Sequence, residues 1–346
     1  MTFYTTPINI VDIEPTSFCN AKCPHCLREI HEGDYNFINN NQFDESFFDI
    51  FFSKEVASQL KMACFCGNIS EPSMNKNLPQ MLKWFRKQNP DVFLEVWTNG
   101  GVQSPEWWKT LGEIIGPNGN IIFGIDGLED TNHIYRIGVK WNKVIENAKA
   151  YISSGAKCTW QFIPFKHNQH QVEQAEQLSK DMGFTNFKIK LSHRHLLNQP
   201  RNPSNTVEPA DDPRYMHPGK SLDLTNFKDT ERYLDSVDIN CYAIDSGNIF
   251  INSDGLVFPC CFIASIFFLD DNMYPGGYNW INPAKDKFDR TEISLYHHSV
   301  EDIINSKTFM KIKESWNLKM AAGRNPVCAA MCGKCSNNNS LQQFNR

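Results

Sequence analysis

The chain has 346 residues, of which 41% are hydrophobic and 21% charged, and its formal net charge is −5. These values are typical of a globular protein with a sizeable core, arranged as one large and one smaller domain or as two ordinary domains. The lack of a basic excess argues against nucleic acid or an anionic membrane as the main partner. No apolar run is long enough to span a bilayer, and no basic segment precedes an apolar stretch at the N-terminus, so we expect a cytoplasmic protein.

Alternating strand and helix patterns fill the first two-thirds of the chain. Strands are expected at 8–13, 61–66, 92–98, 121–126, 158–165 and 187–191, and helices at 43–60, 78–88, from 105 onward, 141–153 and 169–182. Six strands joined by helical crossovers predict a parallel sheet with helices outside, as in a partial (β/α)6 TIM-like barrel. A dinucleotide-binding fold is the competitor, but no G-x-G-x-x-G follows the first strand.

A different pattern begins near residue 198. Prolines among polar residues predict a linker over 198–235. Two short strand-like runs, 248–251 and 256–259, then flank the turn 253–255 and predict a hairpin, and a final helix is expected at 300–316. The chain is thus divided into a core barrel at 1–197, the linker, and a small α+β domain at 236–346.

Twelve cysteines are grouped at short spacings rather than spread along the chain. Three lie within 19–26, three within 328–335, and pairs occur at 64/66 and 260/261. In a chain with cytoplasmic features, such grouping indicates metal or cluster ligation rather than a disulfide framework.

The first group, Cys19, Cys23 and Cys26, follows the first strand as a CxxxCxxC run. Three thiolates on one loop can hold three corners of a 4Fe–4S cubane and leave the fourth iron open to a small molecule. A structural zinc site with His25 as fourth ligand and an ordinary ferredoxin-type cluster are the alternatives.

Because a CxxxCxxC run follows the first strand, residues 8–195 resemble the radical S-adenosylmethionine (SAM) superfamily. Four further segments carry the resemblance: 67–72 (similar to Gly-Gly-Glu-Pro), 98–100 (Thr-Asn-Gly), 124–127 (similar to Ser-Leu-Asp-Gly) and 133–138 (similar to Tyr-Arg-Gly). The resemblance implies that SAM is bound by Glu71, Thr98, Asn99, Asp126 and Arg136. Glu71 would receive the methionine ammonium group and Arg136 the carboxylate. Gly124 stands where the family has a serine hydroxyl.

The second group of cysteines resembles the C-terminal twitch or SPASM extension of radical SAM enzymes. The resemblance implies an auxiliary 4Fe–4S cluster on Cys241, Cys260, Cys332 and Cys335, with Cys328 as an alternate ligand. A one-cluster twitch form fits the number of cysteines better than a two-cluster SPASM form. A structural zinc knuckle is the alternative.

The function implied is reductive cleavage of SAM to a 5′-deoxyadenosyl radical that abstracts a substrate hydrogen. A peptide is the favoured substrate and dehydrogenation of a small molecule the second choice, with an external reductant of the flavodoxin or ferredoxin type. Two alternatives belong to other functional classes: a zinc-binding interaction protein and a plain iron–sulfur electron carrier. Cys64, Cys66 and Cys158 are interpreted as buried core thiols, and residues 193–195 as a solvated turn with substrate contact as the alternative.

Overall fold

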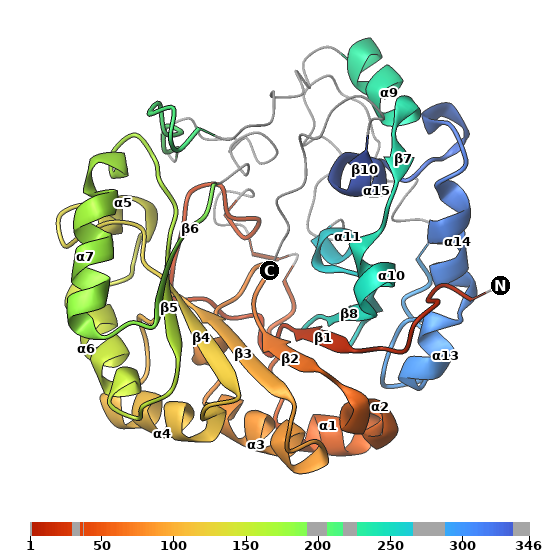
Figure 1. The fold of residues 1–346 in the computed structure, drawn as a ribbon. Coiled ribbons are helices and arrows are strands. Elements are labelled where there is room, and N and C mark those ends of the chain that lie inside the picture. Colours follow the sequence, from red (N-terminus) through yellow and green to blue (C-terminus); the bar gives the residue numbers. More distant parts are fainter. Residues whose placement is uncertain are drawn as a thin grey trace.

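A single curved sheet of eight strands forms the centre of the molecule (Figure 1). The computed structural model describes residues 2–29, 35–36, 38–191, 206–216, 227–265 and 288–334. The strand order is β6-β5-β4-β3-β2-β1-β8-β9, and all neighbours are parallel except β8 and β9. The strands are β1 (Ile10–Ile13), β2 (Met62–Phe65), β3 (Phe93–Thr98), β4 (Gly119–Gly124), β5 (Cys158–Phe162), β6 (Asn186–Ile189), β8 (Asn248–Ile251) and β9 (Val257–Phe258).

Helices cover the outer side of this sheet (Figure 1). In the barrel they are α1 (Glu45–Phe51), α2 (Lys54–Gln59), η1 (Pro72–Met74), α3 (Leu78–Gln88), α4 (Pro105–Ile115), α5 (Asn132–Tyr135), α6 (Trp141–Ile152), η2 (Gln169–Gln171) and α7 (Val172–Met182). The alternating strand and helix order explains the parallel sheet, because each crossover returns the chain to the same edge. The predicted fold class, a partial (β/α)6 barrel, is confirmed by β1 to β6.

Alternation along each strand divides the core from the barrel interior. On the outer side, Phe65 of β2 packs against Phe85 of α3 with ring centroids 5.8 Å apart, and Phe123 of β4 packs against Trp108 of α4 at 5.4 Å. The alternate positions point inward and include the buried polar residues Asp12, Glu95, Thr159 and Gln161. The interior of the barrel therefore offers polar side chains to whatever enters it.

The predicted helix at 43–60 is wrong as a single helix. The chain leaves helical geometry at Phe52, whose φ and ψ are −103° and 131°, and starts again as α2. The side chain of Ser53 accepts a hydrogen bond from the Val56 amide and caps the new helix. A strong N-cap in mid-segment outweighed the continuous helical pattern of the phenylalanines.

The C-terminal part of the chain contains α9 (Phe227–Ser236), β7 (Asp238–Ile239), α10 (Tyr242–Ser246), α11 (Cys261–Ser265), α13 (Val300–Ile304), α14 (Lys307–Ser315), η5 (Met320–Ala322), α15 (Pro326–Cys332) and β10 (Gly333–Lys334). Strands β7 and β10 pair antiparallel as a separate sheet. The expected helix at 300–316 is divided into α13 and α14, because Ser306 caps the second helix.

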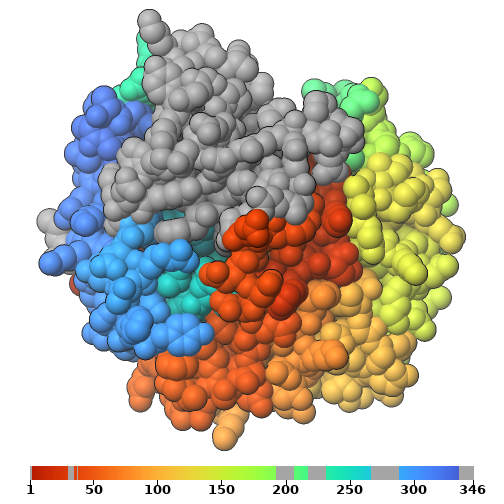
Figure 2. Space-filling view, turned by 180° about the vertical axis from the view of Figure 1, so that it is seen from behind, coloured from red at the N-terminus to blue at the C-terminus, as the bar shows by residue number. Residues whose placement is uncertain are grey.

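Strands β8 and β9 form the predicted hairpin, with Phe250 opposite Phe258. The hairpin does not stand apart, however, because β8 lies parallel to β1 and continues the barrel sheet. On the back of the molecule the segment containing Tyr296 and α13 packs beside α1 and α2 (Figure 2), with the rings of Phe51 and Tyr296 4.9 Å apart. The domain limits 1–197, 198–235 and 236–346 stay a prediction, and the described part of the expected linker includes α9.

Within the described residues, no helix is both long enough and apolar enough to cross a membrane.

Candidate functional site

The cysteine loop that follows β1 is fixed against the carboxyl ends of the neighbouring strands. The Asn99 side chain, after β3, donates from Nδ2 to Asn20 Oδ1 at 2.9 Å, and the Lys22 amide donates to the Ile137 carbonyl at 2.9 Å. A Cβ on Gly138 would lie 2.8 Å from the Asn20 carbonyl oxygen. The predicted motifs around 20, 99 and 137 are therefore in direct contact.

The thiols of Cys19, Cys23 and Cys26 lie close enough together to act on one another electrostatically. Burial raises the pKa of Cys23 to about 11, Arg136 opposes that rise, and Cys26 adds to it. Burial also raises the pKa of Cys19, with further contributions from Glu71 and the other two thiols. The structure thus brings together the three cysteines that the sequence pattern groups.

His25 stands between these cysteines in a left-handed backbone conformation, with φ of 60°. The side chain is buried, and its Nε2 atom lies 3.3 Å from the Val207 carbonyl oxygen. This ring nitrogen contacts a backbone group of the segment 206–216, so the contact does not support the alternative in which His25 completes a zinc site through that atom.

Glu71 connects the loop after β2 to the end of β3. Its Oε1 accepts from the hydroxyls of Ser73 at 2.6 Å and Thr98 at 2.5 Å, and its Oε2 accepts from the Asn99 amide at 2.7 Å. Glu71 is 4% exposed, so these donors replace the water that a buried carboxylate has lost. Glu71, Thr98 and Asn99 therefore form one connected group.

Asp126 and Arg136 form an ion pair that sequence motifs alone do not predict. Arg136 Nε donates to Asp126 Oδ2 at 2.7 Å, while the Ile163 amide donates to Asp126 Oδ1 at 2.7 Å. Arg136 Nη1 lies 4.0 Å from Cys23 Sγ, so the guanidinium bridges the carboxylate and the cysteine loop. A Cβ at Gly124 would crowd Arg136 Nη2, so any larger residue at this position requires the guanidinium to shift.

Arg28 is a residue of this site that the sequence interpretation missed. Its Nη1 donates to the carbonyls of Ser17 at 2.6 Å and Ile69 at 3.2 Å, and so joins the loops after β1 and β2. Nothing in the spacing of motifs marks this residue beyond its place two residues after Cys26.

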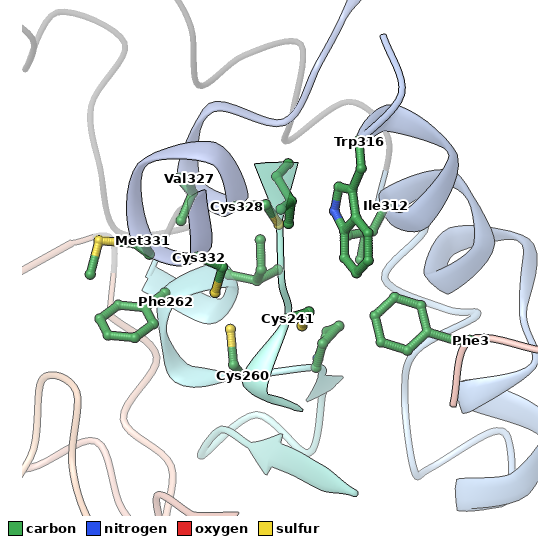
Figure 3. A pocket seen from close by; sticks show the side chains of 13 residues that line it. Phe3, Cys241, Cys260, Phe262, Ile312, Trp316, Val327, Cys328, Met331 and Cys332 are labelled. Atoms are coloured by element: carbon green, nitrogen blue, oxygen red, sulfur yellow. The ribbon is translucent and has the colours of Figure 1, made fainter. Parts of the chain in front are cut away.

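Four thiols of the C-terminal part line one small apolar cavity (Figure 3). They belong to Cys241, Cys260, Cys328 and Cys332, and Trp316 is among the side chains around them. Pairing of β7 with β10 places Cys332 beside Cys241, and a side-chain hydrogen bond between the two lowers the pKa of Cys241. Soft sulfur donors in an apolar cavity fit an iron–sulfur cluster.

The structure includes the alternate ligand Cys328 in this set, one helical turn before Cys332 on α15. Burial raises the pKa of Cys328 to about 12. Cys335 and residues 193–195 lie outside the described residues.

Comparison with known families gives a match for residues 241–336 to SPASM, an iron-sulfur cluster-binding domain. The C-terminal part of the chain is therefore similar to this cluster-binding domain. The match covers all cysteines predicted for the auxiliary cluster, including Cys328 and Cys335. A search of curated proteins found none that matches this sequence.

Solved structures with a similar fold hold SAM. SuiB from Streptococcus suis, bound to S-adenosylmethionine, is 15% identical with a TM-score of 0.50, and the match covers 86% of this chain and 77% of SuiB. The anSMEcpe structure with bound AdoMet is 16% identical with a TM-score of 0.53, and the match covers 92% of this chain and 85% of that one. The predicted fold class, a partial (β/α)6 TIM-like barrel followed by a small α+β domain, is confirmed. The individual ligand assignments stay predictions.

Proposed function

We propose that this SPASM-domain protein is a radical SAM enzyme, with a 4Fe–4S cluster on Cys19, Cys23 and Cys26. The observation that carries the proposal is the packing of the three-cysteine loop against the ends of β3 and β4, through Asn99 and Arg136. Function at the carboxyl ends of barrel strands is the rule for barrels of this kind. When bound, the cluster supplies the electron that cleaves SAM and so produces a 5′-deoxyadenosyl radical.

The spacing of the three thiols supports a cluster rather than a single ion. In the described ranges, their sulfur atoms do not meet a mutual limit of 4.8 Å. Two sulfurs on one zinc lie at most about 4.6 Å apart, because each Zn–S bond is about 2.3 Å. At least one pair of the three sulfurs therefore lies too far apart for a shared zinc ion as the side chains stand.

The contacts around the loop support the proposed SAM-binding roles. Glu71, held by Thr98 and Asn99, offers a buried carboxylate for the methionine ammonium group. Arg136 uses Nε for Asp126 and keeps donors on its Nη atoms, which a methionine carboxylate can accept. Asp126 then acts by holding the guanidinium in place.

An auxiliary 4Fe–4S cluster is proposed for the apolar cavity of the SPASM domain, on Cys241, Cys260 and Cys332 with Cys328 or Cys335 as fourth ligand. Four thiolates would saturate the cluster, which suits electron transfer better than substrate binding. Net oxidation of the substrate would follow if this cluster accepts an electron.

A peptide is the substrate class that we propose, and a small molecule is the alternative. SuiB has been solved bound to its precursor peptide SuiA, and anSMEcpe with the Cp18Cys peptide. The match to the latter covers 97% of this chain at a TM-score of 0.53. An external one-electron reductant of the flavodoxin or ferredoxin type and a cytoplasmic location complete the proposal.

The test is SAM cleavage by anaerobically reconstituted protein. We expect 5′-deoxyadenosine from the wild type with dithionite, and at least a hundredfold less from Cys23→Ala. Cys158→Ala is the matched control, because Cys158 is a buried thiol on β5 and is expected to leave cleavage intact. A brown wild-type protein that binds SAM without cleaving it would contradict the proposal.

The substrate class can be tested by isotope transfer. A pool of fully deuterated peptides should pass deuterium into 5′-deoxyadenosine, whereas a deuterated pool of sugars and other small metabolites should not. The reverse result would favour the small-molecule dehydrogenase.

A further inference from the structure

Two buried side chains on the first two strands, Asp12 and Cys64, and the partly buried Cys66 just after the second strand form a second possible ligand group, separate from both sets of cluster cysteines. Asp12 of β1 lies directly opposite Cys64 of β2 in the parallel register, and Cys66 follows on the same face as Cys64. One donor atom from each of the three lies within 4.8 Å of the other two. Throughout the described ranges, no other trio of histidine, cysteine or acidic residues meets this limit.

The group is buried inside the barrel. Asp12 is 0% exposed and Cys64 is 1% exposed, so neither is a surface group that water can solvate. A carboxylate beside two thiols in such a place is costly when ionised, unless a cation compensates the charge. Burial and proximity together favour a bound cation.

Outer contacts hold the carboxylate and one thiol in position. Asn248 of β8 donates from Nδ2 to Asp12 Oδ2 at 3.2 Å. Cys64 Sγ lies 3.7 Å from Glu95 Oε1 of β3, and this oxygen accepts from Trp97 Nε1 at 2.6 Å. Metal sites are commonly built in this way, with a second layer of hydrogen bonds that orients the ligands.

We propose that Asp12, Cys64 and Cys66 bind one divalent cation of the Zn²⁺ class inside the barrel. Two thiolates with one carboxylate are a donor set that suits zinc, which also takes a fourth ligand. The three residues leave that position for water, for a polar group of a substrate, or for the nearby Glu95. The site does not depend on SAM cleavage, since none of its residues belongs to the proposed clusters.

The test is the metal content of the anaerobically purified protein with its iron–sulfur clusters in place. After incubation with Zn²⁺ and desalting, we expect about one zinc per wild-type chain and at least a tenfold loss in the Cys64→Ser/Cys66→Ser double variant. Iron content should be the same in both, which shows that the variant is folded. Cys158→Ser, a change at another buried thiol of the same sheet, should keep its zinc.

X-ray absorption at the zinc edge identifies the ligands without interference from iron. Two sulfur and two oxygen or nitrogen neighbours are expected, whereas four sulfurs would place the zinc on the SPASM cysteines and overturn the proposal. Retention of zinc by the double variant, absence of zinc from the wild type, or a Cys64–Cys66 disulfide in the mass spectrum would also overturn it.

Asp12→Asn provides a second variant if the double variant fails to fold. It keeps both thiols and the size of the side chain, and should lower zinc affinity at least tenfold in competition with a chelator. Unchanged affinity would remove Asp12 from the site. Failure of SAM cleavage with zinc in place would instead contradict only the proposed function.

Discussion

Arg136 joins Asp126 to Cys23: its Nε donates to the Asp126 carboxylate at 2.7 Å, and its Nη1 lies 4.0 Å from the Cys23 sulfur. The carboxylate is completely buried, and its burial raises the pKa of Asp126 while Arg136 opposes that rise. The ion pair therefore connects the end of β4 to the cysteine loop, and neither partner can be removed without leaving a buried charge unpaired.

Replacement of Arg136 by methionine should be strongly destabilising, because it leaves a buried carboxylate without its partner. We expect a loss of about 3–5 kcal/mol in the free energy of unfolding, measured by urea denaturation under anaerobic conditions. Arg214→Met is the control: the exposed Arg214 pairs with the partly buried Asp212, and its loss should cost no more than about 1 kcal/mol. Equal losses of unfolding free energy in Arg136→Met and Arg214→Met would show that burial of the Asp126 carboxylate does not increase the cost of removing its partner.

Gly124→Ala tests why glycine stands at a position where the family that this chain resembles has serine. The new Cβ would crowd Arg136 Nη2, which Asp126 holds in place, so we expect a loss of about 1–3 kcal/mol through overpacking. In the Arg136→Met background the same substitution should cost much less, because the crowded atom is gone. If the losses of unfolding free energy from Gly124→Ala and Arg136→Met were additive in the double variant, crowding of Arg136 would not be the cause of the first loss.

The contact between Asn20 and Asn99 should give a measurable coupling. A double-mutant cycle with alanine at both positions is expected to show an interaction of about 1 kcal/mol in urea unfolding. Asn118, which precedes β4 and bonds to the Asp91 carbonyl, is a suitable comparison. Asn20 and Asn118 should behave additively, since they lie at opposite ends of the strands.

His167 should make stability sensitive to mild acid. Burial, with smaller effects of His133 and His170, lowers its pKa from 6.5 to about 4. The unfolded chain therefore binds the extra proton first, and stability that is present above pH 6.5 is lost as the pH falls toward 4. Relative to wild type, His167→Asn should keep about 1–2 kcal/mol more of its pH 7 stability at pH 5. If the melting temperatures of the two proteins fell by the same amount between pH 7 and pH 5, this prediction would be contradicted.

The fourth ligand of the SPASM cavity can be assigned by iron analysis. Cys328 lines the cavity with Cys241, Cys260 and Cys332, so Cys328→Ala should lose about four irons per chain. If Cys335→Ala has that effect and Cys328→Ala does not, the sequence interpretation was right to prefer Cys335.

The strands and helices of the barrel were largely predictable, because hydrophobic alternation and capping residues act locally. The helix α3 was expected at 78–88 and lies at Leu78–Gln88. The break between α1 and α2 was missed, since the phenylalanine pattern continues across Ser53 although the backbone does not. Local patterns describe which face is buried, but a competing cap decides where a helix stops.

The sequence by itself determined the cysteine groups, the strand after which each motif lies, and the class of fold. Only the tertiary structure decided which motifs touch: Arg136 bonds to Asp126 and approaches Cys23, and Asp12 meets Cys64 across two strands. The reason is that spacing along the chain fixes separation within one element, whereas the register of parallel strands brings Asp12 to Cys64 and the packing of loops at the strand ends brings Arg136 to Cys23.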